Sequence, residues 1–254
     1  MQQKVEFRGQ VSFDKAGTGT GAMVYPTNGL GLAGLLVGIA THATISNSAR
    51  NGQKSEIEKE ADKVLQPFQG TLDGFQQGEM AGLALLDDAS MPLLTDNASP
   101  VGMVIVSAPV FYMTQDRSAL ILDNTVSVFN AERGEKPVYQ NTVRVVSRAS
   151  EAADLVAYWQ QEEGRALRSE SAALFRQSVD IVRQQALATT TEAAAARTFR
   201  YQEGKKEAME RAQLLSEHCD RALVKNLRGW LMSIPLKRQA APGPECEAPE
   251  QVAL

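Results

Sequence analysis

Histidine and cysteine, the residue types that most often carry nucleophilic or metal chemistry, are scarce in this chain of 254 residues, which has two of each. Three candidates for a thiol nucleophile or a zinc site stand together, at His218, Cys219 and Asp220. Neighbouring residues point in different directions on a helix and to opposite faces of a strand, so the three cannot converge. A structural zinc site also needs about four ligands with paired spacing. We therefore expect no metal, no cofactor and no catalytic residue here.

Short motifs of known enzymes occur only in incomplete form. The pattern SxxK at 12–15 lacks its companion elements, and YxxxK at 201–205 lacks an upstream dinucleotide-binding fold. The glycines of 17–21 form GxGxG rather than GxGxxG, and no acidic residue follows them before Glu56. Because a dinucleotide site needs the longer pattern and an acidic residue about 20 positions on, these glycines predict a turn.

Charge is distributed unevenly along the chain. Between Ala16 and Ala49, 34 residues contain no Asp, Glu, Lys or Arg, whereas residues 197–238 hold ten basic and five acidic side chains. The net charge of −4 excludes a protein that is basic overall. Basic residues among aromatic ones suit a nucleic acid or an anionic membrane, but the acidic residues weaken this field and no nucleic-acid motif accompanies it. We therefore expect no nucleic-acid partner, and a solvated basic face explains the segment equally well.

Residues 29–46 are apolar and rich in small side chains, with Gly34 and Gly38 in a GxxxG pair. Such a pair lets helix backbones approach closely. Eighteen residues are about the minimum for a helix that spans a bilayer, but His42 would be costly in lipid. The segment is predicted to be a glycine-rich apolar helix, either in contact with a membrane or buried in protein.

Four further glycines recur at intervals of four residues: Gly70, Gly74, Gly78 and Gly82. On one helix they would form a stripe without side chains. Each costs about 1 kcal/mol of helix stability relative to alanine, so the helix requires something that packs closely against the stripe. The candidates are the 29–46 segment and the same stripe of a second copy. The alternative is a glycine-rich loop in which the spacing is accidental.

The two cysteines, Cys219 and Cys246, lie 27 positions apart. In an oxidising compartment they are candidates for a disulfide that would stabilise the fold by roughly 3–4 kcal/mol. In a reducing cytosol they would be two separate thiols. The first residues do not form a signal peptide, which is expected of a cytosolic protein or of one whose signal has been removed.

Strand patterns predict an antiparallel β-meander of three or more strands. Apolar residues run or alternate through 101–113, 120–128 and 138–147, and the connections between these segments are short and polar. Short connections make neighbouring strands antiparallel. A further strand, at an edge of the sheet or half-buried, is predicted at 4–13.

Helical spacing predicts an amphipathic helix over 50–66 that Pro67 ends, and two helices over 150–163 and 165–190 separated by Gly164. The segment 206–230 also keeps helical spacing, but a strand reading with turns near Gly204 and Cys219 competes with it. The predicted fold is therefore α+β, a meander packed with helices.

Three regions are predicted: an N-terminal part over 1–86, an α+β domain over 87–238 and a flexible tail over 239–254. The uncharged run and the glycine spacing favour a non-catalytic protein of the cell envelope or membrane surface. We expect it to act by self-association, or by binding another envelope protein, through close helix packing. The expected place is the periplasm or a membrane surface, with the cytoplasm as the alternative. The alternative function is a soluble enzyme or a nucleic-acid-associated protein whose site comes from residues distant in sequence.

Overall fold

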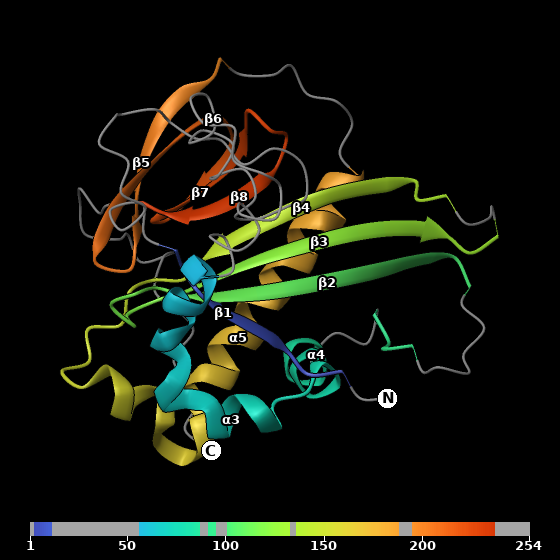
Figure 1. Cartoon of the computed structure of the whole chain (residues 1–254). Coiled ribbons are helices and arrows are strands. Elements are labelled where there is room, and N and C mark those ends of the chain that lie inside the picture. Colours follow the sequence, from blue (N-terminus) through green and yellow to red (C-terminus); the bar gives the residue numbers. More distant parts are fainter. Residues whose placement is uncertain are drawn as a thin grey trace, which may run out of the picture.

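A computed structural model describes residues 3–11, 56–86, 91–94, 101–132, 136–187 and 195–236. In these ranges the chain forms a mixed sheet of eight strands with helices beside it, so the α+β prediction is confirmed (Figure 1). The strands are β1 (Glu6–Gly9), β2 (Met103–Met113), β3 (Leu120–Asn130), β4 (Tyr139–Val146), β5 (Arg197–Glu203), β6 (Lys206–His218), β7 (Arg221–Asn226) and β8 (Leu231–Pro235). The helices are η3 (Lys63–Phe68), α3 (Gln69–Gly74), α4 (Gln77–Leu85) and α5 (Leu155–Leu187).

The strand order across the sheet is β1-β2-β3-β4-β8-β7-β6-β5. The pairs β1/β2 and β4/β8 are parallel and the others are antiparallel. The predicted meander is therefore confirmed as β2-β3-β4, and it continues into a larger sheet. Pro109 lies inside β2.

Helix α5 covers one face of the meander. Every second residue of β3 from Leu120 to Val128 is buried toward it, in one hydrophobic core with Leu167 and Val182 of the helix. Phe68 and Phe75, which precede residue 87, belong to the same core. The described residues of the predicted 1–86 and 87–238 regions therefore share a core.

The boundary that we predicted inside α5 is confirmed at Gly164. The backbone is non-helical from Gln161 to Gly164, where φ is +82°. Glycine adopts this left-handed region readily. A Cβ at Gly164 would also overlap the side chain of Thr71. The helix thus turns where a residue without a side chain is required.

The prediction of a helix over 206–230 is wrong, and its strand alternative is correct. This segment forms β6, β7 and the turn that leads to β8, and Cys219 has φ +56° in the turn between β6 and β7. Ala212, Ala222 and Val224 are fully buried, whereas Leu227 of the supposed helical face is 59% exposed. Burial follows a period of two, so the helical spacing was coincidental.

Two predictions about the N-terminal half also need correction. A helical stretch at 56–62 continues into η3, which contains Pro67, so the proline does not end it. The glycines of 70–82 do not share one helix, because Phe75 and Gln76 are extended (ψ 112° and 148°) and separate α3 from α4. The extended backbone buries the Phe75 side chain completely and lets its carbonyl accept a hydrogen bond from the N–H of Val5 at 3.0 Å.

Several predictions concern residues outside the described ranges. They include the apolar helix at 29–46, with Gly34 and Gly38, and the tail at 239–254. Within the described ranges, no helix has the length and apolar character that crossing a membrane requires.

Candidate functional site

The sheet has a second packed face, opposite α5. Ile121 of β3 and Val146 of β4 point to this side and pack with residues of the C-terminal strands: Phe199, Tyr201, Ala212, Ala222, Val224, Met232 and Ile234. Because these residues come from both halves of the sheet, β5–β8 must curve over the meander (Figure 1). We call this side the inner face.

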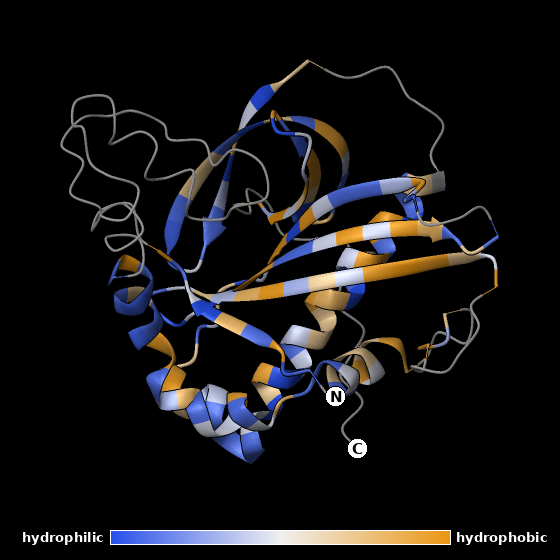
Figure 2. Ribbon diagram, turned by 45° about the vertical axis from the view of Figure 1, so that its right-hand side comes forward, coloured by the Kyte–Doolittle hydropathy of each residue, from blue (hydrophilic) through white to orange (hydrophobic). Residues whose placement is uncertain are grey.

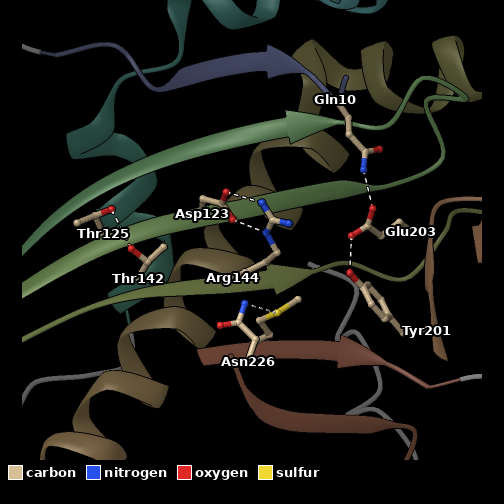
Figure 3. A network of polar contacts seen from close by, with 9 residues as sticks. Gln10, Asp123, Thr125, Thr142, Arg144, Tyr201, Glu203 and Asn226 are labelled. Carbon is tan, nitrogen blue, oxygen red and sulfur yellow. Dashed lines mark hydrogen bonds and ion pairs between the residues drawn. The ribbon is translucent and has the colours of Figure 1, made fainter. Parts of the chain in front are cut away.

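An ion pair lies next to this core on the inner face. Asp123 and Arg144 stand opposite each other in β3 and β4, and the guanidinium donates to both carboxylate oxygens, Nε to Oδ1 at 2.6 Å and Nη2 to Oδ2 at 2.7 Å (Figure 3). Burial by itself would lower the pKa of Arg144, but Asp123 and the nearby Glu203 outweigh it and raise that pKa well above its usual value. The bidentate geometry fixes the register of two central strands.

Glu203 at the end of β5 accepts two hydrogen bonds. The Tyr201 hydroxyl donates to Oε1 at 2.7 Å, and Gln10 Nε2 donates to Oε2 at 2.6 Å (Figure 3). Burial and the charge of Glu203 raise the pKa of Tyr201 well above its usual value, so this hydroxyl remains a donor at neutral pH. Burial and Asp123 likewise raise the pKa of Tyr112, to about 12.

The turn between β7 and β8 brings an aromatic ring to the ion pair. Asn226 Oδ1 accepts hydrogen bonds from the backbone N–H groups of Arg228 and Trp230, both at 3.0 Å. The guanidinium carbons of Arg144 and Arg228 lie 5.7 and 5.1 Å from the centre of the Trp230 ring. Burial lowers the pKa of Arg228 and raises that of Glu210, and each of these two groups opposes the shift of the other.

These contacts define what the polar cluster does chemically. Both oxygens of Asp123 and both oxygens of Glu203 accept hydrogen bonds from protein side chains. Perturbed pKa values also mark catalytic sites, but ion-pair networks that only stabilise a fold produce them too. In the described part of the chain, no three His, Cys, Asp or Glu residues are grouped to hold a metal ion. The hydrogen bonds of Glu203 link the end of β5 to the residue that follows β1, and the ion pair links β3 to β4.

The four glycines of 70–82 lie at exposed or half-buried positions. A Cβ added at Gly70, Gly78 or Gly82 would meet no atom within 4 Å, and one at Gly74 would meet only Arg168 Nη2, at 3.8 Å. Among the described residues, therefore, no second helix packs against Gly70, Gly78 or Gly82, and Gly74 meets α5 only at the end of the Arg168 side chain. Contact with another copy or with another protein stays a prediction.

The residues around Cys219 do not converge on a site. Asp220 pairs with Arg148, on the segment after β4. Cys219 occupies the turn between β6 and β7, and Cys246 lies outside the described residues. The disulfide between the two cysteines stays a prediction.

An exposed apolar surface is the feature that our sequence reading missed. It has parts on α4, the 91–94 segment and the outer half of β2, which lie on the same side of the molecule in both views (Figures 1 and 2). Its large exposed side chains are Leu83, Leu86, Leu93, Leu94, Val101, Met103 and Val106. Residues 97–115 contain no charged side chain, and this run was the available signal. We call this region the apolar edge surface.

Comparison with known proteins adds no relative. No family model matches the chain, and neither the curated proteins nor the solved structures contain a significant match to it.

Proposed function

We propose that the protein is a non-catalytic assembly component of the cell envelope or membrane surface. It binds a second copy of itself, or another envelope protein, by close helix packing at α4. The observation that carries this proposal is the open space around two glycines on one face of that helix, Gly78 and Gly82.

Glycine inside a helix costs about 1 kcal/mol relative to alanine. A side chain at Gly78 or Gly82 would meet no atom of the described chain, so the internal packing gives no reason for a glycine at either position. Two residues four positions apart lie on the same side of a helix, where bare backbone admits a second helix.

The surroundings of these glycines support a protein partner. Leu83 and Leu86, at the end of α4, are 42% and 74% exposed. They belong to the apolar edge surface, and contiguous exposed apolar surface is typical of interaction sites. Met80 and Ala84 form the buried side of α4 and anchor the helix in the core, so its glycines are not needed for that packing.

The test replaces both glycines with a good helix former that is polar and larger, Gly78→Gln with Gly82→Gln. We expect the double variant to fold like the wild type and to lose self-association, or retention in the membrane fraction, in a detergent-free preparation of the full chain. Lys59→Gln, on the exposed surface of the 56–62 helix, is the control and should change nothing. A wild-type chain that stays monomeric and outside the membrane fraction would contradict the proposal.

A further inference from the structure

The outer half of β2 is an unprotected strand edge. Strand β1 pairs with β2 only from Val110 to Met113, so within the described ranges Met103–Pro109 hydrogen-bonds to β3 on one side and to no strand on the other. Seven residues of β-strand extend over about 24 Å. Unpaired N–H and C=O groups along such a length form a template for another strand.

The two outermost strands of the sheet, β1 and β5, carry charged side chains, whereas Met103–Pro109 of β2 carries none. Strand β1 is four residues long and carries Glu6 and Arg8, which are paired in a salt bridge. Strand β5 carries Arg197, Arg200 and Glu203 among its seven residues. Charged side chains and short length are the devices by which proteins prevent edge pairing. The segment Met103–Pro109 has no charged side chain and is seven residues long. A proline, Pro109, stands only at its inner end.

We propose that Met103–Pro109 pairs antiparallel with the same segment of a second copy, which joins two sheets across a two-fold axis. This inference rests on the proposed function, because it names the partner and a second contact surface for the same assembly. A two-fold contact places one surface against itself, which requires that the surface be self-complementary.

The segment meets that requirement. With the axis at Val106, Val104 faces Ala108 of the other copy and Ile105 faces its Ser107, so no charge meets a like charge. Val106 is 51% exposed and Met103 is 57% exposed, and pairing covers one flank of each side chain with a strand of the other copy. The alternation of β2 puts Val104, Val106 and Ala108 on the inner face, so the two copies form one apolar row there.

A second copy suits this edge better than an unrelated protein does. The segments that carry the exposed leucines, α4 and 91–94, lie on the same side of the molecule as this edge (Figures 1 and 2). An uncharged edge offers no charge by which to select a different chain. Within the described part of the chain, β1 and β5 are short or charged, the unpaired stretch of β4 covers only Tyr139–Thr142, and both half-paired stretches of β6 contain charged residues. Met103–Pro109 is therefore the longest uncharged stretch of described strand that has one side unpaired.

The experiment measures the oligomeric state of the full chain by sedimentation equilibrium over a concentration series. We expect the wild type to dimerise and Val106→Lys to raise the dimer dissociation constant about 100-fold, because two ammonium groups would meet at the axis. Val106→Thr keeps the shape of the strand and should retain the dimer. Thr125→Lys puts the same charge on the same face at an exposed position of the neighbouring strand β3, opposite Ala108, and should also retain the dimer.

The outcomes separate this inference from the proposed function. A monomeric Val106→Lys variant whose thermal unfolding matches that of the wild type supports β2 pairing. If Val106→Lys remains dimeric while Gly78→Gln with Gly82→Gln dissociates, β2 pairing is overturned and the proposed function stands. A monomeric wild type overturns β2 pairing in every case.

Discussion

Gln10 donates a hydrogen bond from its amide nitrogen to Oε2 of Glu203 at 2.6 Å, across 193 positions of sequence. Gln10 directly follows β1 and Glu203 ends β5, and these are the two outermost strands of the eight-stranded sheet. The sheet therefore curves until its two edges meet at one end. The turn between β5 and β6 adds a second link, because the backbone N–H of Lys205 donates to Asp116 Oδ2 at 2.8 Å.

Gln10→Ala should weaken this closure. The substitution removes a partly buried hydrogen bond to a carboxylate, and we expect the free energy of unfolding to fall by about 1–2 kcal/mol. Urea denaturation followed by circular dichroism measures it. Gln66→Ala, at an exposed position of η3, is the control, and an equal loss in both variants would contradict the closing role of Gln10.

The ion pair on the inner face gives a second prediction. Arg144→Leu leaves the Asp123 carboxylate, which is 14% exposed, without its bidentate partner, and we expect a loss of about 3 kcal/mol. Replacing both residues, Asp123→Leu with Arg144→Leu, should recover most of this loss because no unpaired charge remains. A double-mutant cycle measures the coupling, and additive losses would show that the two groups stabilise the fold independently.

The parts of this fold that sequence could predict are those that depend on local pattern. The alternation at 120–128 and the polar connections on both sides of it identify the meander, because each strand carries its own period of two. Gly164 marks the break in α5 because a positive φ favours one residue type.

The parts that sequence could not predict depend on contacts between distant segments. Asp123 meets Arg144 only when the register of β3 and β4 is known, and Gln10 meets Glu203 only when the whole sheet curves. The glycine spacing is regular, yet α3 and α4 separate because Phe75 is needed in the core, and the spacing carries no information about that need. In 206–230 the apolar residues fit both a helical and a strand pattern. Packing of this segment against the sheet decides that it forms strands.

The stability of the fold should depend on pH through Asp116. Burial by itself would raise the pKa of Asp116, but hydrogen bonds from Ser118, Thr114 and the backbone N–H of Lys205 outweigh it and lower the pKa below 3.8. A carboxyl group with a lowered pKa stabilises the folded state at any pH above the pKa that it has in the unfolded chain. This contribution is lost as the pH falls through the pKa that the group has in the folded protein.

Asp116→Asn should therefore be less stable than the wild type at pH 7, and the difference should shrink as the pH falls toward and below 3.8. Thermal unfolding at a series of pH values measures this difference. Asp73→Asn, on the exposed surface of α3, serves as the control. A difference between Asp116→Asn and the wild type that stays constant from pH 7 to pH 3 would show that the carboxylate charge is not the cause.

Two glycines should respond in opposite directions to the same substitution. A Cβ at Gly9 would overlap the backbone carbonyl of Ala61, where β1 meets the 56–62 helix. The backbone N–H of Gly9 also donates to Asp62 Oδ1 at 2.7 Å. Because neither backbone can yield easily, Gly9→Ala should destabilise the chain by about 1–3 kcal/mol.

At Gly78 the space is open, so Gly78→Ala should stabilise the chain by about 0.5–1 kcal/mol through helix propensity. Urea denaturation of both variants measures the two changes. A loss of stability in monomeric Gly78→Ala would mean that this glycine serves internal packing, and the energetic reason to infer a partner at α4 would then be gone.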